Sequence, residues 1–316
     1  MRRIVLYFLC LGVFSLSGCT EEKPTKLTVL SSIKTIQSNV SAVGGDNIIS
    51  QRLIPDYASP HHYAFKPSDL KKLSQADLVF RIDEHFEVML NPALKNLSNQ
   101  SKIISLADQP TIKLVPLAEG DHHQHGDEEG HDDEKKHNKQ EHNAVNLHIF
   151  TSPKNMIEVS KIVADSLSKL DADNAQTYQL NAQKLIDEIT QTTTGLKQNL
   201  APYKDVPYVI FHNSWQYFAN EVGIQKPIIV NLQEGVVAGG KTINQIRSEI
   251  VAKHIHCVFR DPVISEARVK VLTENSANTN IKSVTIDVLE KDIVVGQDSY
   301  VQWLEKMGGI VEECLK

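Results

Sequence analysis

Residues 152–200 read SPKNMIEVSKIVADSLSKLDADNAQTYQLNAQKLIDEITQTTTGLKQNL, an almost continuous helical pattern in the middle of the chain. The stretch begins as a helix should, because Ser152 supplies a capping hydroxyl and Pro153 suits the first helical position. Apolar residues then recur at helical spacing, namely Met156, Val159, Ile162, Val163, Leu167 and Leu170. A second helical pattern runs from about Asp171 to Leu200. We therefore predict a helical connector over 153–200, rigid enough to limit hinge motion.

Strand-like runs alternate with amphipathic segments on both sides of the connector. Before it, strands are predicted at 27–30, 76–82 and 102–106, and helices around 33–40, from 67, and over 84–97. After it, strands are predicted at 207–211, 257–259 and 283–286, followed by a C-terminal helix. This alternation indicates an α/β fold of two lobes, 26–152 and 201–316, each a mainly parallel sheet flanked by helices. No internal sequence repeat is evident.

Composition places the chain among globular proteins. It has 316 residues, of which 41% are hydrophobic and 23% charged, so it can bury a substantial core. The formal net charge of −6 argues against nucleic acid as a partner.

The N-terminus resembles an export signal. Met1–Arg3 is a short basic region, and the apolar run from Ile4 to Leu16 is too short to span a bilayer as a stable helix. The run ends in LSGC at 16–19, which resembles the bacterial lipoprotein box. We predict a lipoprotein-type signal peptide over 1–18, lipidation of Cys19 and a tether over 19–25, giving a periplasmic or cell-surface protein anchored to the membrane. An ordinary cleaved secretory signal is the alternative, and it also exports the protein.

Two cysteines remain in the folded part of the chain once Cys10 of the signal and Cys19 are set aside. In an exported protein the remaining pair, Cys257 and Cys314, most simply forms one disulfide. That bond would attach the C-terminal helix to a strand. Two free buried thiols are the alternative.

The stretch DHHQHGDEEGHDDEKKHNKQEH, at 121–142, combines six histidines with eight carboxylates. Such a composition cannot bury enough apolar surface to fold by itself, so we predict a solvated loop. Imidazole and carboxylate at this density suit transition ions, above all zinc. A charged surface insertion without metal is the alternative. The predicted auxiliary, low-affinity ligands are His122, His123, His125, His131, His137 and His142.

Three histidines outside the loop are notable for their placement. His61 lies in a turn-rich segment before a helix, and His148 lies just before the connector. His212 immediately follows an apolar strand, where open α/β sheets bind ligands. A single such histidine is more often structural than a ligand, so the prediction of a metal site depends on the set.

Several motifs now support a resemblance that covers essentially the whole mature chain. PHHYAFKPSD at 60–69, followed by ADLV at 76–79, resembles the "PHxY…PSD…ADLV" signature of the cluster A-I solute-binding proteins, the zinc and manganese receptors of ABC importers. NLHIFTSP at 146–153 resembles the family's "HxWxSP/DP", and FHNSWQYF at 211–218 resembles its "FHDAYxYF". TIDVL at 285–289, followed by Tyr300, resembles its "LDPLG…Y". The zinc-specific members, the ZnuA type, also carry a His/acid loop and a C-terminal cysteine pair.

The resemblance implies a zinc site in the cleft between the lobes. It assigns His61 and His148 to the N-terminal lobe and His212 to the C-terminal lobe. Three imidazoles and one oxygen would give a tetrahedral site suited to Zn²⁺. The oxygen is predicted to come from Asp287, with water as the alternative. Manganese receptors of the family usually have a carboxylate at the position of His212, so histidine there favours zinc.

Other residues are weaker candidates. Some zinc members have a glutamate just before the first histidine, but this chain has Pro60 there. His62 is expected to point away from His61, because adjacent residues in an extended turn point apart. His85 is a candidate for transient metal contact at the mouth of the cleft. His254 and His256 are expected at the surface or near a helix end.

The function predicted from these features is that of an extracytoplasmic zinc receptor, with Zn²⁺ as the transported ligand. It would be a monomer that delivers Zn²⁺ to the membrane permease of an ABC importer and would not be an enzyme. An exported zinc metalloenzyme is the main alternative, although H-E-x-x-H and G-x-S-x-G are absent from the sequence. A manganese-type receptor or an adhesin of the same family is the other.

Overall fold

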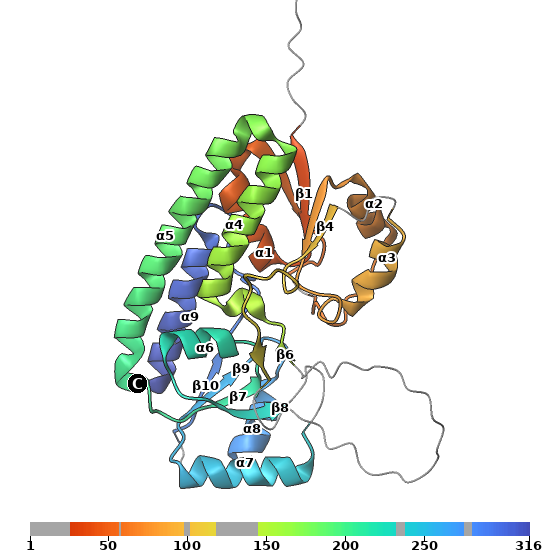
Figure 1. The fold of residues 1–316 in the computed structure, drawn as a ribbon. Coiled ribbons are helices and arrows are strands. Elements are labelled where there is room, and N and C mark those ends of the chain that lie inside the picture. The colour runs from red at the N-terminus through yellow and green to blue at the C-terminus, as the bar shows by residue number, and fades with distance from the viewer. Residues whose placement is uncertain (1–25, 57, 98–101, 118–144, 232–237, 275–279) are drawn as a thin grey trace, which may run out of the picture.

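The structure is a computed structural model that describes residues 26–56, 58–97, 102–117, 145–231, 238–274 and 280–316. The predicted signal peptide, the tether with Cys19 and the His/acid loop at 121–142 therefore lie outside the described residues. Two lobes lie one above the other, and three long helices run along one side of both (Figure 1). These helices are α4 (Pro153–Leu170), α5 (Ala175–Leu200) and α9 (Ser299–Leu315).

The N-terminal lobe is built on a parallel sheet whose two faces are both buried. Its strand order is β2-β1-β3-β4. The strands are β1 (Leu27–Ser31), β2 (Ile48–Arg52), β3 (Leu78–Arg81) and β4 (Ile103–Ser105). One face, with Val29 and Phe80, packs in the same core cluster as α1 (Lys34–Gly44). The other face, with Leu30 and Val79, packs with α2 (Pro67–Gln75) and α3 (Asn91–Lys95). Burial on both faces explains why the central strands β1 and β3 are mostly hydrophobic.

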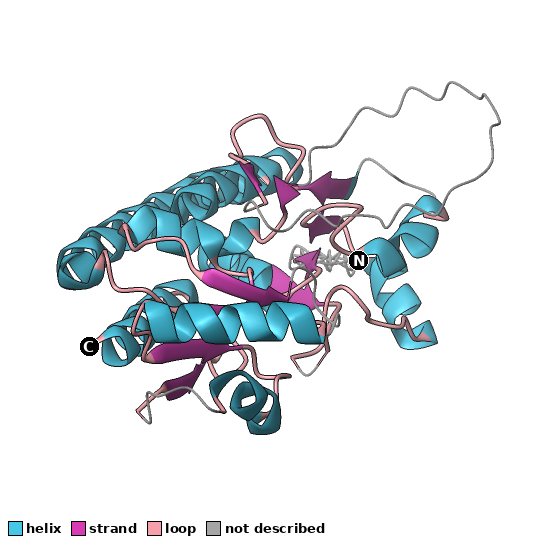
Figure 2. Ribbon diagram, turned by 90° about the horizontal axis from the view of Figure 1, so that it is seen from below, coloured by secondary structure: helices cyan, strands magenta, loops and turns pink. Residues whose placement is uncertain are grey.

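The C-terminal lobe repeats this arrangement. Its parallel sheet has the order β10-β9-β7-β8, so the strands of each lobe, counted in chain order, lie as second, first, third and fourth. The strands are β7 (Val209–His212), β8 (Ile228–Asn231), β9 (Cys257–Arg260) and β10 (Lys282–Thr285). Val209 and Val258 pack with α7 (Gly240–Ala252) and α8 (Glu266–Thr273), while Phe259 packs with α6 (Gln216–Val222) and α9. Figure 2 shows the strands of this lobe from below, with helices beside them. The predicted two-lobed α/β fold is confirmed.

The connector is a pair of helices that pack against each other along their length (Figure 1). As predicted, Ser152 caps α4, its Oγ accepting a hydrogen bond from the Asn155 amide at 3.0 Å. The long helix α5 then returns toward the C-terminal lobe and packs against α9. A Cβ at Gly308 of α9 would overlap the side chain of Leu196 of α5, so glycine permits this close approach. Because α1 also packs against α4, α5 and α9, the three helices support both lobes.

Some elements differ from the sequence prediction. The helix predicted over 84–97 is a 3₁₀ turn at Val88–Leu90 followed by the short α3, because Pro92 lacks an N–H and favours a helix start. Strands β2 and β8 were not predicted. Two further short strands, β5 (Val115–Pro116) and β6 (Val145–Asn146), pair antiparallel on either side of residues 118–144.

The C-terminal helix is attached to its lobe as expected. Cys257 of β9 and Cys314 of α9 form a disulfide, so the predicted pairing is confirmed. Within the described residues, no helix combines the length and apolar character needed to cross a bilayer.

Candidate metal centre

His212 is the last residue of β7, a strand paired on both sides within its sheet. The three preceding residues are buried strand positions, and His212 is the first side chain past them, 14% exposed. A parallel strand flanked on both sides presents its carboxyl end to the cleft. The backbone therefore fixes the position of this imidazole firmly.

His61 and His148 come from irregular segments. His61 lies in the turn between β2 and α2, and its ring packs edge-on against Phe86, with ring centroids 4.5 Å apart. His148 precedes the 3₁₀ turn Ile149–Thr151 and is 9% exposed. Its ring also contacts Phe86, at 5.3 Å between centroids. Phe86 is thus an apolar wall shared by both histidines.

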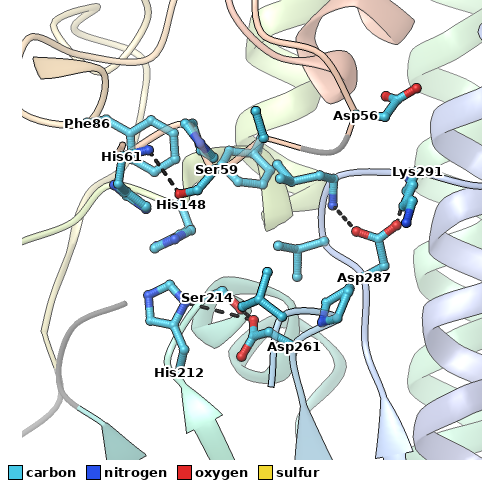
Figure 3. A pocket seen from close by; sticks show the side chains of 17 residues that line it. Asp56, Ser59, His61, Phe86, His148, His212, Ser214, Asp261, Asp287 and Lys291 are labelled. Carbon is cyan, nitrogen blue, oxygen red and sulfur yellow. Dashed lines mark hydrogen bonds and ion pairs between the residues drawn. The ribbon is translucent and has the colours of Figure 1, made fainter. Parts of the chain in front are cut away.

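The three imidazoles meet in the cleft between the lobes (Figure 3). One ligand atom from each of His61, His148 and His212 lies within 4.8 Å of the other two. The ring centroids of His148 and His212 are 4.8 Å apart, and His61 lies 5.5 Å from His148 and 6.2 Å from His212. These three histidines come from three separate segments, and one small ion would suffice to bridge them.

Each histidine has a polar partner that orients its ring. The His148 Nδ1–H donates to Asn146 Oδ1 at 2.8 Å, which leaves Nε2 free to bind a metal. The His61 ring hydrogen-bonds the backbone of Phe86. The His212 Nδ1 faces Asp261 Oδ1 at 3.8 Å, too far for a hydrogen bond but close enough for electrostatic attraction. One ring nitrogen of each histidine lies within 4.8 Å of the ligand atoms of the other two.

The cluster is prepared for a cation because two of its members resist protonation. Burial, together with the neighbouring His212 and His62, lowers the pKa of His61 to about 4. Burial also lowers the pKa of His148 well below its ordinary value, with His212 and His61 contributing. Neutral imidazole is the form that binds metal, so near neutral pH few protons compete at these two ligands.

Solvent-accessible space lies on two sides of the cluster. A cavity of about 190 Å³ is lined by the three histidines together with Asp261 and Asp287. A second cavity, of about 360 Å³, is lined by the same histidines and by His62 and His85. Leu117 and Val145, which flank residues 118–144, also line this second cavity. The chain that carries the His/acid loop therefore leaves and re-enters the fold beside the metal centre.

The structure does not bring the Asp287 carboxylate into the cluster. Asp287 lines the same cavity, but its Oδ1 accepts the amide of Leu289 at 3.0 Å and its Oδ2 that of Lys291 at 2.6 Å. Its carboxylate is turned toward its own loop in Figure 3. In this conformation the Asp287 carboxylate would have to turn away from its own loop to join the three imidazoles around one ion.

The remaining described histidines lie outside the cluster. His62 and His85 are exposed, and His85 is near Glu84, at 3.7 Å between Nε2 and Oε1. His254 is exposed, and the His256 ring lies 3.3 Å from the carbonyl oxygen of Leu315 at the end of α9. That contact agrees with the helix-end position expected for His256.

Asn146 links the segment of His148 to the C-terminal lobe. Its Oδ1 accepts from the His148 ring, and its Nδ2 donates to the carbonyl of Asn213, the residue after His212, at 2.8 Å. The hydroxyl of Tyr217 donates to the Asn146 carbonyl at 2.6 Å. The segment of His148 is thus bonded to the C-terminal lobe while its ring packs on Phe86 of the N-terminal lobe.

Sequence reasoning missed three residues that shape the centre: Phe86, Asn146 and Asp261. Asn146 and Asp261 each had a usable signal, because one lies two residues before a candidate ligand and the other directly follows a strand. Phe86 gave no such signal. Its position depends on Glu87, a buried residue whose carboxyl group accepts the amides of Ile82 and Asp83, both at 3.0 Å.

Comparison with known proteins identifies the family. The sequence model of the family described as "ZnuA: Zinc-uptake complex component A periplasmic" matches residues 29–314, nearly the whole chain. The chain belongs to the ZnuA family. A curated relative, the high-affinity zinc uptake system protein ZnuA of Yersinia pestis, is 28% identical over 293 residues, covering 91% of each chain.

Solved structures of ZnuA proteins have the same fold. A crystal structure of ZnuA aligns with a TM-score of 0.75 at 21% identity, over 92% of this chain and all of that one. A zinc-bound ZnuA deletion mutant, which lacks residues 138–173 of its own sequence, aligns with a TM-score of 0.73 at 21% identity. The alignment covers 92% of this chain and 98% of that one. The family is one of zinc-uptake components, so the receptor class predicted from the sequence is confirmed.

Proposed function

We propose that this protein is an exported zinc receptor that binds one Zn²⁺ tightly between His61, His148 and His212. The observation that carries the proposal is the meeting of three imidazole ligand atoms within 4.8 Å in the interlobe cleft. Three neutral nitrogen donors with room for a fourth ligand suit the tetrahedral preference of Zn²⁺. Membership of a zinc-uptake family supports the same ion.

The fourth ligand is an oxygen on the C-terminal side of the cleft. Asp287 is the carboxylate predicted from the sequence, and it lines the cavity beside the histidines. Because both of its oxygens accept backbone amides, the conformation described here suits a water as fourth ligand. Mn²⁺ prefers oxygen donors, so a site with three imidazoles favours zinc over manganese.

The proposal also covers the location of the receptor, its oligomeric state, its partner and the role of its His/acid loop. We infer that Cys19 anchors the mature protein to a membrane and that the protein acts as a monomer. It would deliver Zn²⁺ to the permease of an ABC importer, in keeping with the family's role in a zinc-uptake complex. The His/acid loop at 121–142 would bind further ions weakly and raise their concentration near the second cavity. In this role the protein would not act as an enzyme.

Zinc titration of the mature chain by calorimetry tests the proposal. We expect one tight event at the cleft and weaker events from the His/acid loop. The double variant His61→Ala/His148→Ala should lose the tight event. The matched control is His62→Ala/His85→Ala, because it removes two exposed histidines beside the same cavity and should keep that event.

Deletion of residues 121–142 separates the two kinds of binding. The shortened chain should keep the tight event and lose the weaker ones. If the tight event survives the His61/His148 double replacement, or disappears with the loop, then the cleft is not the primary site.

A further inference from the structure

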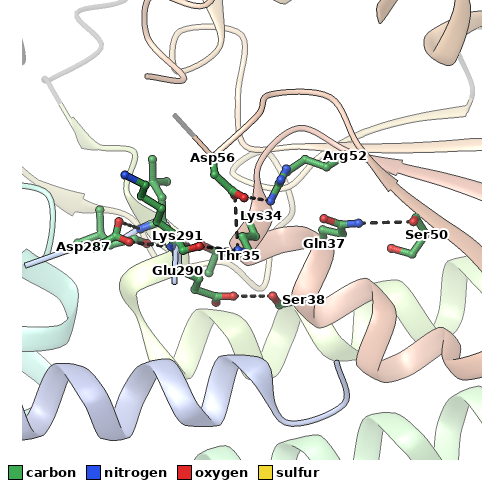
Figure 4. Close-up of polar contacts among 12 residues, drawn as sticks. Lys34, Thr35, Gln37, Ser38, Ser50, Arg52, Asp56, Asp287, Glu290 and Lys291 are labelled. Carbon is green, nitrogen blue, oxygen red and sulfur yellow. Dashed lines mark hydrogen bonds and ion pairs between the residues drawn. The ribbon is translucent and has the colours of Figure 1, made fainter. Parts of the chain in front are cut away.

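The loop that follows β10 is attached to the other lobe by three buried side chains of α1 (Figure 4). Lys34 Nζ donates to the carbonyl of Lys291 at 3.0 Å, and Thr35 Oγ1 donates to that of Val288 at 3.4 Å. The third bond is made by Ser38 Oγ, which donates to Glu290 Oε2 at 2.5 Å. We call these three bonds between α1 and residues 287–291 the interlobe latch.

Glu290 is an unfavourable choice of residue for its position. Its φ of 58° lies in the left-handed region, where a residue other than glycine is strained. Its side chain is 1% exposed, and its Oε1 has no hydrogen-bond partner among the described residues. Burial raises the pKa of its carboxyl group to about 7. The motif that this stretch resembles has glycine here, which would remove the strain and the buried acid together.

Strain and burial of this kind persist where the surrounding structure holds a residue for a purpose. The partner of Glu290 is Ser38, which is 1% exposed and belongs to the opposite lobe. The glutamate therefore gives the loop a contact across the cleft that glycine cannot provide.

The loop fixed in this way also fixes Asp287. The two amides that bind the Asp287 carboxylate, those of Leu289 and Lys291, lie on either side of Glu290. Trp303 Nε1 of α9 holds the Asp287 carbonyl at 2.9 Å. Movement of residue 290 would change the orientation of both amides, and with it the position of the carboxylate.

The latch also reaches the segment that leads to His61. Lys34 Nζ lies 3.5 Å from Asp56 Oδ1, which pairs with Arg52 at 2.7 Å. Asp56 and Asp287 line the same cavity as the three histidines. One end of α1 thus contacts the segments on both sides of the cleft.

We propose that Glu290 is a positioning residue for the metal site: through Ser38 it holds the 287–291 loop so that Asp287 stays on backbone amides and away from the ion. The site then offers three imidazoles and a water, and it disfavours ions that need several oxygen donors. This inference rests on the proposed function, because it requires an ion at the histidines.

The test uses Co²⁺ as a spectroscopic probe, since its visible absorption is stronger with four ligands than with five or six. Wild-type protein should show strong four-coordinate bands. In Glu290→Gly the loop is released and Asp287 can bind the ion through both carboxylate oxygens, which raises the number of ligands above four, so the bands should weaken. The affinity for Mn²⁺ relative to Zn²⁺ should rise by about tenfold, the scale typical of changes to residues that orient ligands.

Three further variants make the result specific. Adding Asp287→Ala to Glu290→Gly should restore the wild-type spectrum, because the effect passes through that carboxylate. Glu290→Gln keeps an acceptor for Ser38 and should retain the wild-type spectrum and ion preference. His254→Gly is the matched control, because His254 is the other described non-glycine residue with a left-handed φ, 52°. His254 is exposed and lies outside the metal site.

Thermal unfolding checks that each variant is folded. Ser38→Ala removes the hydrogen bond to Glu290 from the other lobe, so it should change the spectrum and the ion preference in the same direction as Glu290→Gly. The inference is overturned if folded Glu290→Gly keeps the wild-type spectrum and ion preference, or if its change survives Asp287→Ala. If wild-type protein itself takes up neither Co²⁺ nor Zn²⁺ at the histidines, the proposed function fails and this inference fails with it.

Discussion

The two lobes share one strand order but contribute to the metal centre in different ways. In the C-terminal lobe the ligand is the last residue of the first strand, β7, and the order of the sheet places it directly. The equivalent strand of the N-terminal lobe, β1, ends at the buried Ser31, and no ligand stands there. His61 instead comes from the turn after the second strand. Two sheets of the same strand order therefore supply their ligands differently, one from the end of a strand and the other from a turn.

The corresponding third strands show how closely the frameworks match. Val79-Phe80-Arg81 of β3 and Val258-Phe259-Arg260 of β9 have the same residues and the same pattern of burial. Both strands are followed by an aspartate within two residues, Asp83 and Asp261 respectively. Asp83 accepts the amide of His85, whereas Asp261 faces His212. Divergence between the lobes is thus concentrated beyond the strand ends.

Removal of the single ligand of the C-terminal lobe should have the largest effect. Zinc binding to a site of four ligands has a free energy of about 10–16 kcal/mol, or about 3 kcal/mol for each ligand. His212→Ala should therefore weaken zinc binding by about a hundredfold or more. The metal-free protein should stay folded, because the change removes a partly exposed ring at the cleft, near two other histidines. Chelator competition measures the affinity, and His256→Ala, beside the neighbouring strand, is the control. An affinity within threefold of wild type would mean that the strand end does not hold the ion.

The pH dependence of stability tests whether His61 is buried as a neutral base. Because burial lowers the pKa of His61 from its ordinary value of 6.5 to about 4, the unfolded chain binds more protons than the folded chain between these two values. Stability of the metal-free protein should therefore fall as pH decreases through this window, by about 2 kcal/mol at pH 5 for His61 alone. Urea unfolding at pH 7 and pH 5 should show that His61→Gln loses less stability than wild type by this amount.

Wild type and His61→Gln must be compared because buried acids change the pH dependence of stability in the opposite direction. Burial raises the pKa values of Glu87 and Glu290 to about 7, so each becomes less unfavourable as pH falls. Their contribution is common to wild type and His61→Gln and cancels in the difference. An identical pH dependence in the two proteins would mean that His61 is not buried as a neutral base.

The sequence predicted what depends on periodicity and missed what depends on contacts between distant residues. Strands β1, β3, β4, β7, β9 and β10 were predicted from apolar runs, and the capped start of α4 from Ser152 and Pro153. Strand β2 escaped prediction because Ser50, Gln51 and Arg52 interrupt its apolar pattern at the edge of the sheet. The helix predicted over 84–97 failed because Pro92 and the turn held by Glu87 limit it.

The same division applies to the site. His61, His148 and His212 were selected by their placement and by family motifs, and the structure brings them together. The position of Asp287 was not accessible in this way, because the motif gives the residue but not the hydrogen bonds of its carboxylate. Glu290 was missed because its partner Ser38 lies 252 residues away in the sequence.

The smallest effects should come from the residues that orient the ligands, and they sharpen the contrast between the two lobes. His148 depends on a hydrogen bond of 2.8 Å to Asn146, so Asn146→Ala should weaken zinc binding by about tenfold. Asn146→Asp keeps the acceptor for the His148 ring but loses the donor to the Asn213 carbonyl, so its affinity should fall between those of Asn146→Ala and wild type. Asp261→Asn should change the affinity less than Asn146→Ala, because its carboxylate lies 3.8 Å from His212, whose position the strand already fixes. If Asp261→Asn instead costs more, then His212 is oriented by its carboxylate partner and the rigidity assigned to the strand end is wrong.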